Sequence, residues 1–459
     1  MYFSQYYLDC LSLASYLIAD EGTKRAILVD PRRDINEYLA DAEARGFTIE
    51  GVINTHFHAD FLAGHLEVAA ATGAWIGYGQ RAEAEYPIRR LADGERISLG
   101  DVTLEIMETP GHTPESISVL VYEHADDPVP YGVLTGDALF IGDVGRPDLL
   151  ASLGYTAEEL ASMLYDSIQR LMRLPDSVRV FPAHGAGSAC GKNLSTERQS
   201  TIGEQRRTNY ACAPMSREEF IKLVTSGQPS APSYFAFDAV LNRKTRELFD
   251  HTRLARPLDA KEFAALRAEG ALVIDARDPQ EFAAGHVRGS LNVPIDGRFA
   301  ETAGSVASPD RTLLVIAPQD REEEVITRLA RIGFDRVAGY LREPDHAFLE
   351  MIADLSRASR LTVPQLREVL EQDEPPVVLD VRNAGEREKG TIDGSLHIPL
   401  AELPRRLDEV PTDRPVVAFC AGGYRSSVAA SLLRSAGHPD VSDLIGGYTA
   451  WQAMAPVGA

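Results

Sequence analysis

Two histidines and an aspartate follow a short apolar run near the start of the chain. His56, His58 and Asp60 lie at alternate positions after residues 51–54, whose composition is typical of a buried strand. Three more polar side chains occupy similar settings further along, each after apolar residues and at a turn marked by Gly or Pro: His112, Asp137 and His184. Because such a set can direct several ligands at one point, we expect a metal ion to bind where these residues meet.

The types of these side chains leave two metals open. Two imidazoles and one carboxylate make an open facial site that suits non-haem Fe(II), with positions left for substrate and dioxygen. Three histidines and a water molecule would suit hydrolytic zinc instead. The six residues include both combinations, so residue type alone does not choose between the two metals.

In their order and turn settings, the six residues resemble the metal motifs of the metallo-β-lactamase superfamily. The resemblance covers the first half of the chain and implies an αββα sandwich with the metal at one edge of the sheets. The superfamily motif usually reads His-x-His-x-Asp-His, but Phe61 occupies the place of the last histidine, which two-metal members use for their second ion. We therefore expect one metal ion.

Within this superfamily the chain looks like the persulfide dioxygenases, because residues 145–148 (Gly-Arg-Pro-Asp) match their Gly-Arg-x-Asp element after the metal aspartate. In that subgroup the iron ligands correspond to His56, His112 and Asp137. The resemblance makes the other three polar residues catalytic outer groups that orient ligands and move protons, or alternative ligands: His58, Asp60 and His184.

Four residues near the metal motifs are candidates for contacts with the thiol that carries the persulfide. Arg146 and Asp148 are expected to contact that carrier or to support their own loop. Cys190 lies shortly after His184 among small residues that allow close approach of a substrate, so a substrate contact and a packed thiol are equally expected. Lys192 would lower the pKa of Cys190 or bind an acidic carrier.

A second place for chemistry lies near the end of the chain, at the sequence Cys-Ala-Gly-Gly-Tyr-Arg-Ser that starts at Cys420. The apolar run 416–419 before it is typical of a buried strand, and residues 428–436 have the apolar spacing of a helix. Backbone N–H groups at the start of that helix would stabilise an anion, and Arg425 adds a positive charge. Both effects favour the thiolate, so we expect Cys420 to act as a nucleophile.

Residues 360–457 resemble the rhodanese sulfurtransferases, through this Cys-x-x-x-x-Arg loop and the Asp-x-Arg…Glu…Gly…Gly-Ser…Ile-Pro pattern before it. In that family the cysteine carries sulfur as a persulfide, and the loop amides hold the outer sulfur. The resemblance therefore implies catalytic roles for Cys420 and Arg425. It implies substrate contacts for three residues between them: Gly422, Gly423 and Tyr424.

The same pattern occurs once before in the chain, at a constant offset. Residues 272–277 (Leu-Val-Ile-Asp-Ala-Arg) match residues 377–382 (Val-Val-Leu-Asp-Val-Arg), and the glycines and the proline that follow also match. Fully apolar strands alternate with helical stretches in both copies, which predicts two parallel α/β domains. In the first copy residues 317–322 (Ala-Pro-Gln-Asp-Arg-Glu) replace the cysteine loop. We expect this copy to be inert and to serve as a spacer or docking surface.

Length, charge and cysteine content set the general frame. The 459 residues suggest three domains, which we place at 1–252, 256–355 and 359–459. The net charge of −22 argues against nucleic acid and anionic membranes as partners, and no stretch is long and apolar enough to span a bilayer. Four scattered cysteines and the lack of a leader pattern predict a cytoplasmic protein without disulfides.

Together these features predict an enzyme that couples two sulfur chemistries. A metallo-β-lactamase-like domain with one Fe(II), or zinc as an alternative, would oxidise a low-molecular-weight thiol persulfide with dioxygen to sulfite. The C-terminal domain would transfer a sulfane sulfur through Cys420 to sulfite, giving thiosulfate, and we expect a homo-oligomer. Two alternatives stay open: a zinc-dependent thioester hydrolase of the glyoxalase II type with a fused sulfurtransferase, and a non-enzymatic persulfide carrier or sensor.

Overall fold

The structure, a computed structural model, describes residues 1–149, 154–250 and 256–454. These residues form two compact units, each with its own sheets and hydrophobic cores. The first unit contains Met1–Pro229 and Phe235–Phe249, and the second contains Ser230–Tyr234 and the chain from Asp250 onward. The segment after residue 229 thus contributes to both units in turn.

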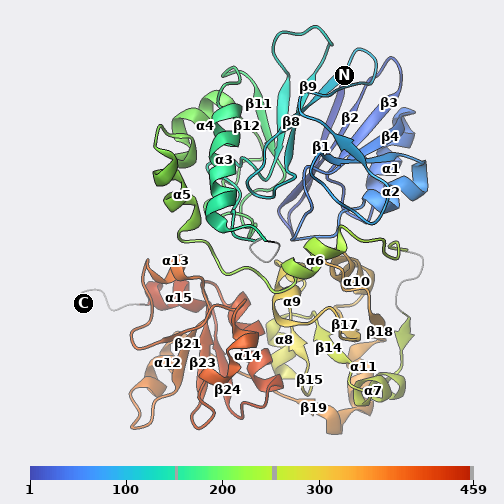
Figure 1. Ribbon diagram of the computed structural model, residues 1–459. Coiled ribbons are helices and arrows are strands. Elements are labelled where there is room, and N and C mark those ends of the chain that lie inside the picture. The colour runs from blue at the N-terminus through green and yellow to red at the C-terminus, as the bar shows by residue number, and fades with distance from the viewer. Residues whose placement is uncertain (150–153, 251–255, 455–459) are drawn as a thin grey trace. The chain divides into compact units, whose positions relative to one another are not determined.

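Two six-stranded sheets form the centre of the first unit (Figure 1). In the first sheet the strands follow one another in chain order, and the neighbours from β3 to β6 are parallel. The carboxyl ends of these strands therefore lie at one edge of the sheet. The strands are β1 (Tyr2–Leu8), β2 (Leu13–Ala19), β3 (Arg25–Val29), β4 (Thr48–Ile53), β5 (Trp75–Gly79) and β6 (Arg89–Leu91).

The second sheet has the order β12-β11-β10-β9-β8-β7. Its neighbours are antiparallel except β10 and β11, which are parallel. Apolar side chains of both sheets, among them Ile18, Ile53, Leu104 and Val119, form one shared core between the sheets. The strands are β7 (Arg96–Ser98), β8 (Thr103–Glu108), β9 (Ile117–Tyr122), β10 (Gly132–Gly136), β11 (Arg179–Pro182) and β12 (Ser200–Thr201).

Helices cover the outer face of each sheet, which completes the predicted αββα sandwich (Figure 1). Helix α3 packs on the second sheet, and it begins where the Thr156 hydroxyl accepts the N–H of Glu159, a cap that contributes about 1 kcal/mol. Helices α1 and α2 pack on the first sheet through Tyr38 and Val68. The helices are α1 (Asn36–Arg45), α2 (His65–Thr72), α3 (Ala157–Leu171), α4 (Ile202–Thr208), α5 (Arg217–Thr225) and α6 (Phe235–Leu241).

The second unit contains two five-stranded sheets with the same topology, which confirms the internal repeat. The orders are β13-β18-β17-β14-β16 and β20-β24-β23-β21-β22, and all neighbours are parallel. In each copy a buried aspartate at a strand end pairs with the arginine that follows: Asp275 with Arg277 at 2.6 Å, and Asp380 with Arg382 at 2.7 Å.

The strands of both copies are short, and the central strands, such as β17 and β23, are fully buried, as expected for parallel sheets covered by helices. Those of the first copy are β13 (Pro257–Leu258), β14 (Leu272–Asp275), β16 (Leu291–Asn292), β17 (Leu313–Ile316) and β18 (Val337–Leu341), with a separate antiparallel pair, β15 (His286–Val287) and β19 (Leu355–Ser356). Those of the second copy are β20 (Ser359–Leu361), β21 (Val377–Asp380), β22 (Leu396–His397), β23 (Val416–Phe419) and β24 (Val441–Leu444).

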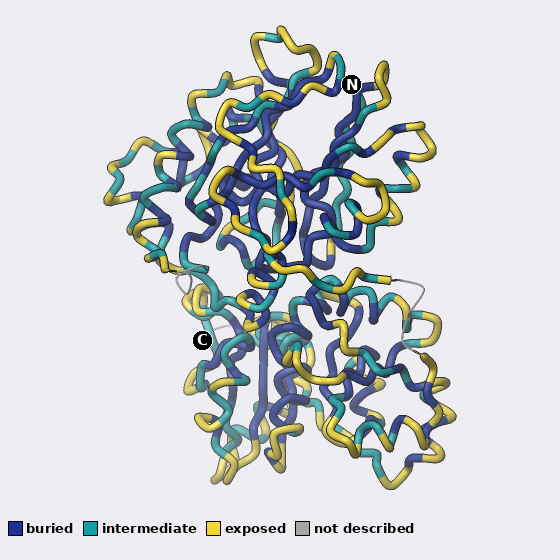
Figure 2. Tube along the Cα trace, turned by 45° about the vertical axis from the view of Figure 1, so that its right-hand side comes forward, coloured by how far each residue is buried: buried dark blue, intermediate teal, exposed yellow. Residues whose placement is uncertain are grey.

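Helices connect the parallel strands in each copy, and the strand centres are buried while the loop tips are exposed (Figure 2). No helix in the described part of the chain combines the length and apolarity needed to cross a membrane. The helices are α7 (Ala260–Ala268), α8 (Pro279–Ala284), α9 (Phe299–Val306), α10 (Glu322–Ala330), α11 (Pro344–Glu350), α12 (Val363–Leu370), α13 (Ala384–Arg387), α14 (Tyr424–Ser435) and α15 (Gly447–Ala453).

Candidate functional site

Three of the candidate ligands meet where strands of both sheets end. His56 follows β4 of the first sheet, and His112 and Asp137 follow β8 and β10 of the second. The Nε2 atoms of His56 and His112 lie 3.8 and 3.5 Å from Oδ2 of Asp137, and all three side chains are buried. Two donor atoms that are each about 2 Å from one ion lie at most about 4 Å apart. The observed distances therefore fit a shared metal ion.

Hydrogen bonds orient both imidazoles with Nε2 toward that point. Nδ1 of His56 donates to Oγ1 of Thr55 at 3.0 Å, and Nδ1 of His112 donates to the backbone carbonyl of Arg146 at 2.9 Å. Each Nε2 atom therefore carries a lone pair. Nε2 of His56 and Oδ2 of Asp137 are buried without a hydrogen-bond partner among the described residues. Such atoms are costly to bury, and a metal ion would satisfy both.

The charges in the cluster favour the protonation states that bind metals. Burial alone would raise the pKa of Asp137, but the adjacent His184 and His56 hold that pKa well below its ordinary value. Burial, together with the neighbouring His58, holds the pKa of His56 well below its ordinary value. The site thus presents an ionised carboxylate and a neutral imidazole, and these are the ligand forms.

Asp30, which was not among the predicted site residues, orders the histidine motif. Its Oδ1 accepts the N–H of Thr55 at 2.7 Å and Nε2–H of His58 at 2.9 Å, while Oδ2 accepts the Thr55 hydroxyl at 2.8 Å. Nδ1 of His58 is buried and has no hydrogen-bond partner in the described part of the chain, and the ring centre of His58 lies 4.1 Å from that of His56. Asp30 directly follows β3. A polar residue directly after an apolar run is the signal that identified His56, and the same signal could have identified Asp30.

A second group of potential ligands lies beside the first: Asp60, His184 and Cys190, all buried, with their donor atoms close together. His184 joins the two groups, because its Nδ1 is 2.8 Å from Oδ1 of Asp137 and its Nε2 is 2.8 Å from Oδ2 of Asp60. Burial opposes protonation, yet the two carboxylates raise the pKa of His184 well above its ordinary value. The arrangement places a proton donor in contact with the candidate ligand Asp137.

Arg146 and Asp148, candidates for substrate contact or loop support, bind each other. The guanidinium donates to the two carboxylate oxygens at 2.8 and 2.6 Å and to the carbonyl of Ala189 at 3.2 Å. The backbone N–H of Arg146 donates to the carbonyl of Cys190 at 3.0 Å, and its carbonyl holds His112. Through these contacts Arg146 fixes the loop behind His112.

The prediction that Lys192 lowers the pKa of Cys190 is wrong. Lys192 donates from Nζ to the carbonyls of Leu223 at 2.7 Å and Ser226 at 3.1 Å, at the C-terminal end of α5. Burial, followed by the charge of Asp60, raises the pKa of Cys190 well above its ordinary value. Lys192 therefore caps a helix, and Cys190 is a buried thiol next to the ligand groups.

Asn242 clamps the loop that follows the histidine motif. Its Nδ2 donates to the carbonyls of His58 and Phe61, each at 2.8 Å, and its Oδ1 accepts the N–H of Ala63 at 2.9 Å. The side chain is fully buried just after α6. No local pattern in the sequence identified it, because its partners lie far away along the chain.

The cysteine loop has the predicted strand–turn–helix arrangement. Cys420 follows β23 and is buried, Gly422 lies in the turn, and α14 begins at Tyr424. The sulfur accepts the N–H of Gly423 at 3.1 Å, and Oγ of Ser426 lies 3.6 Å from it. Gly423 has a φ of 103°, a conformation that favours glycine. The loop therefore brings one backbone hydrogen-bond donor, the N–H of Gly423, to the sulfur.

Two residues of this loop make contacts that the sequence did not indicate. Arg425 donates from Nη1 and Nη2 to the carboxylate of Glu386, each contact at 2.7 Å. The negative charge of Glu386 therefore offsets the positive charge of Arg425. Tyr424 donates its hydroxyl to the carbonyl of Pro294, in the first copy, at 2.8 Å. The side chain of Tyr424 therefore binds the first rhodanese-like copy.

The turn at the corresponding strand end of the first copy, after β17, carries no cysteine. Arg321 in this turn pairs with Asp296 at 2.7 Å and with Glu324 at 2.8 Å. Cys420 of the second copy thus has no counterpart in this turn.

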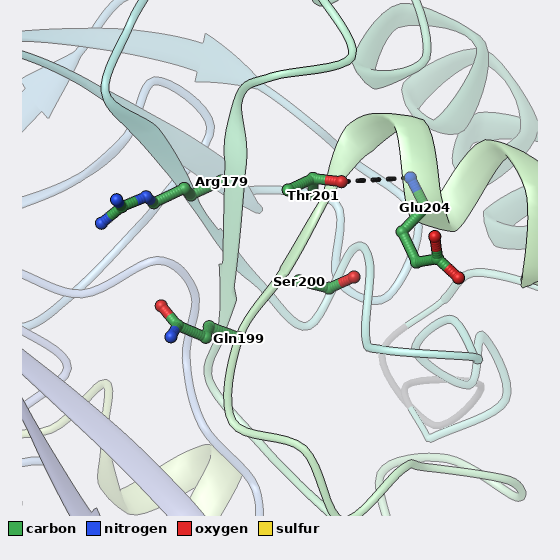
Figure 3. A pocket seen from close by; sticks show the side chains of 5 residues that line it. All are labelled: Arg179, Gln199, Ser200, Thr201 and Glu204. Carbon is green, nitrogen blue, oxygen red and sulfur yellow. Dashed lines mark hydrogen bonds between the residues drawn. The ribbon is translucent and has the colours of Figure 1, made fainter.

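An open pocket of about 450 Å³ lies on the first unit (Figure 3). Its lining includes Arg179, at the beginning of β11, whereas His184 follows the other end of that strand. Thr201 and Glu204 on its wall form the first turn of α4, with the Thr201 hydroxyl accepting the N–H of Glu204 at 3.1 Å. None of the candidate ligands is among the residues that line the pocket.

Known families match both parts of the chain. The Metallo-beta-lactamase superfamily matches residues 8–184, and the Rhodanese-like domain family matches residues 259–342 and 362–454. The crystal structure of a metallo-beta-lactamase from Staphylococcus aureus subsp. aureus COL has 33% sequence identity and a TM-score of 0.67 over 74% of this chain and 98% of that chain.

Two curated relatives have different named activities. Persulfide dioxygenase ETHE1, mitochondrial, of Bos taurus is 27% identical over 50% of this chain and 83% of its own length. Hydroxyacylglutathione hydrolase of Hyphomonas neptunium is 31% identical over 37% of this chain and 60% of its own length. The chain spans 54% to 60% of the length of several curated relatives that it matches. The chain belongs to the metallo-beta-lactamase superfamily and carries two rhodanese-like domains after its metallo-beta-lactamase domain.

Proposed function

We propose that the metal site oxidises a low-molecular-weight thiol persulfide with dioxygen and that Cys420 transfers sulfane sulfur. The observation that carries this proposal is the convergence of two imidazoles and one carboxylate, His56, His112 and Asp137, on one buried point. The similarity to a persulfide dioxygenase over most of that relative's length supports the same reaction.

The proposed oxidation balances with one dioxygen for each sulfur atom. A persulfide, dioxygen and water give a thiol and sulfite, and the outer sulfur loses the four electrons that dioxygen gains. Fe(II) held by two imidazoles and one carboxylate would supply open coordination positions for a sulfur ligand and dioxygen.

The residues around that site would hold the ligands and handle protons. Thr55 and the Arg146 carbonyl fix the tautomers of His56 and His112, and that keeps their Nε2 atoms free to bind metal. His184, in contact with Asp137 and Asp60, would release or take up the proton that is exchanged when persulfide enters and thiol leaves.

The second reaction would take place at the sulfur of Cys420. The thiolate of Cys420 attacks the outer sulfur of a persulfide and releases a thiol, so that Cys420 becomes a persulfide. Sulfite then attacks the outer sulfur of that persulfide, which regenerates the thiolate and gives thiosulfate. The N–H of Gly423, 3.1 Å from the sulfur, would stabilise the negative charge in both states. Because both sites belong to one chain, the covalent linkage would raise the effective concentration of sulfite at Cys420.

Oxygen uptake and product analysis test the two sites separately. The full chain, loaded anaerobically with Fe(II), would be given a small persulfide, and sulfite and thiosulfate would be quantified after subtraction of the uncatalysed reaction. Cys420→Ser should keep oxygen uptake but lose catalysed thiosulfate formation. His112→Ala should lose oxygen uptake but keep catalysed thiosulfate formation when sulfite is added together with the persulfide. Catalysed transfer retained by Cys420→Ser would refute the role of Cys420. Oxygen uptake retained by His112→Ala would refute the metal site.

A zinc-dependent thioester hydrolase is the second candidate. Asp60, His184 and Cys190 could supply a second metal position beside the first, and a hydroxyacylglutathione hydrolase is among the relatives. Phe61, which is fully buried where two-metal members place a histidine, counts against it. Zinc in the purified protein together with thioester cleavage would favour the hydrolase, and a chain that binds neither metal would favour a persulfide carrier or sensor.

A further inference from the structure

One face of α14 lies against the first rhodanese-like copy. Tyr424, Ser431 and Ser435 are spaced seven and four residues apart, so they share this face. Besides the bond from Tyr424 to the Pro294 carbonyl, the Ser431 hydroxyl accepts the N–H of Asn292 at 2.9 Å. The Ser435 hydroxyl donates to the carbonyl of Gly289 at 3.1 Å. The contact therefore follows the helix from its first turn to its last.

The ring of Tyr424 fits closely against the first copy at Gly297. A Cβ atom on Gly297 would stand 2.6 Å from Cε2 of Tyr424, and Gly297 has a φ of 152°. A larger residue at this position would push the ring away from Pro294. The first copy thus has a surface shaped to receive this tyrosine.

Tyr424 directly follows Gly423, the residue that donates a hydrogen bond to the sulfur of Cys420. Gly423, directly before it, donates its N–H to Sγ of Cys420, and Ser426 in the same helical turn lies near that sulfur. The position of the Gly423 peptide depends on the first turn of α14, because Tyr424 begins that helix. A contact that fixes Tyr424 therefore fixes the donor to the sulfur.

We propose that the cysteine-free copy is a scaffold for the sulfur-transfer loop and that Tyr424 is the positioning residue through which it acts. The residue would not contact the substrate. Instead, its anchorage at Pro294 and Gly297 would hold the Gly423 amide on the sulfur of Cys420. The catalytic consequence rests on the proposed sulfur transfer, whereas the anchorage itself does not.

Three variants of the full chain test this proposal. Tyr424→Phe removes only the hydroxyl. Gly297→Val pushes the ring away from the first copy, and it also strains the backbone at that position, but it leaves the sequence of the loop unchanged. Ser435→Ala is the matched control, because it removes a contact with the same copy three turns away from the loop. Thermal unfolding identifies any variant that fails to fold, and Tyr424→Phe, which is nearly isosteric, then carries the test.

Two measurements give the result. Amide hydrogen exchange in the loop peptide 421–427 should become about two- to tenfold faster in Tyr424→Phe, the effect of one lost hydrogen bond, and at least as fast in Gly297→Val. The kcat for sulfur transfer should fall in Tyr424→Phe and at least as far in Gly297→Val. The KM for the sulfur donor should stay unchanged in both variants. Ser435→Ala should match the parent chain in both measurements.

Loop exchange in Tyr424→Phe and Gly297→Val equal to that of Ser435→Ala would overturn the proposal. An unchanged kcat in a variant with faster exchange would also overturn it, because the anchorage would then have no catalytic effect. If the parent chain shows no sulfur transfer at all, the proposed function of Cys420 fails, and the exchange data still decide whether the first copy anchors the loop.

Discussion

Replacing Asn242 by alanine would release the loop that carries the histidine motif. The substitution leaves three buried backbone groups without partners: the carbonyls of His58 and Phe61 and the N–H of Ala63. A hydrogen bond contributes about 1 kcal/mol net, and a buried group left unpaired costs about 1–3 kcal/mol. Since the loop can relax and admit water, we expect the free energy of unfolding to fall by about 3–4 kcal/mol.

This loss is large enough to measure directly. For a unit of this size each kcal/mol lowers the melting temperature by about 2–4 °C, so Asn242→Ala should melt about 6–16 °C below the parent chain by scanning calorimetry. The iron retained after dialysis against a weak chelator should fall too, because the same loop follows His56. Asn193→Ala, which removes an exposed amide, is the control and should change the free energy of unfolding by less than about 0.5 kcal/mol.

A melting temperature of Asn242→Ala equal to that of Asn193→Ala would refute the clamp. A lowered melting temperature with full retention of iron would show that Asn242 stabilises the loop without setting the position of the ligands. Either result would mean that the metal motif is held mainly by Asp30 and Thr55.

Two further perturbations have signs that follow from the structure. Burial of Asp20 would raise its pKa, but four backbone N–H groups, including those of Thr23 and Val102, lower it to about 2. This carboxylate therefore contributes stability above about pH 4, and the contribution is lost as the pH falls from about 4 to 2. Asp20→Asn should lower the free energy of unfolding, measured with urea at pH 7, by about 2 kcal/mol. Near pH 2 its free energy of unfolding should match that of the exposed control Asp101→Asn. Glu386→Gln weakens the two contacts that hold Arg425, so thiosulfate formation should slow about three- to tenfold with oxygen uptake unchanged, and an unaltered rate would count against a role for this ion pair.

The positions of candidate site residues could be predicted from the sequence where local sequence determines them. His56, His112 and Asp137 each follow an apolar run, and a residue that follows a strand must lie at the edge of its sheet. The internal repeat was visible for the same reason, because strand and turn residues recur in order. The six-residue replacement at 317–322 could likewise be read directly as the loss of a nucleophile.

The parts that were missed depend on which distant segments meet. Asn242 reaches the histidine motif from the turn after α6, near the end of the first unit, and no periodicity encodes that contact. Tyr424 was expected to contact substrate because it lies within the loop motif, but the motif does not say which domain faces it. The prediction that Lys192 lowers the pKa of Cys190 was wrong for a related reason. Lys192 is close to Cys190 in sequence, but its ammonium group binds the carbonyl of Leu223.

The oxygen consumed per sulfur atom oxidised by the iron-loaded full chain tests the central claim most directly. With a small persulfide as substrate, one dioxygen should disappear for each sulfur atom oxidised, counted as the sum of sulfite and thiosulfate, with one iron bound per chain, and the zinc-loaded chain should consume none. Thioester cleavage by a chain that holds two zinc ions and takes up no oxygen would contradict the assignment of His56, His112 and Asp137 to a redox-active metal.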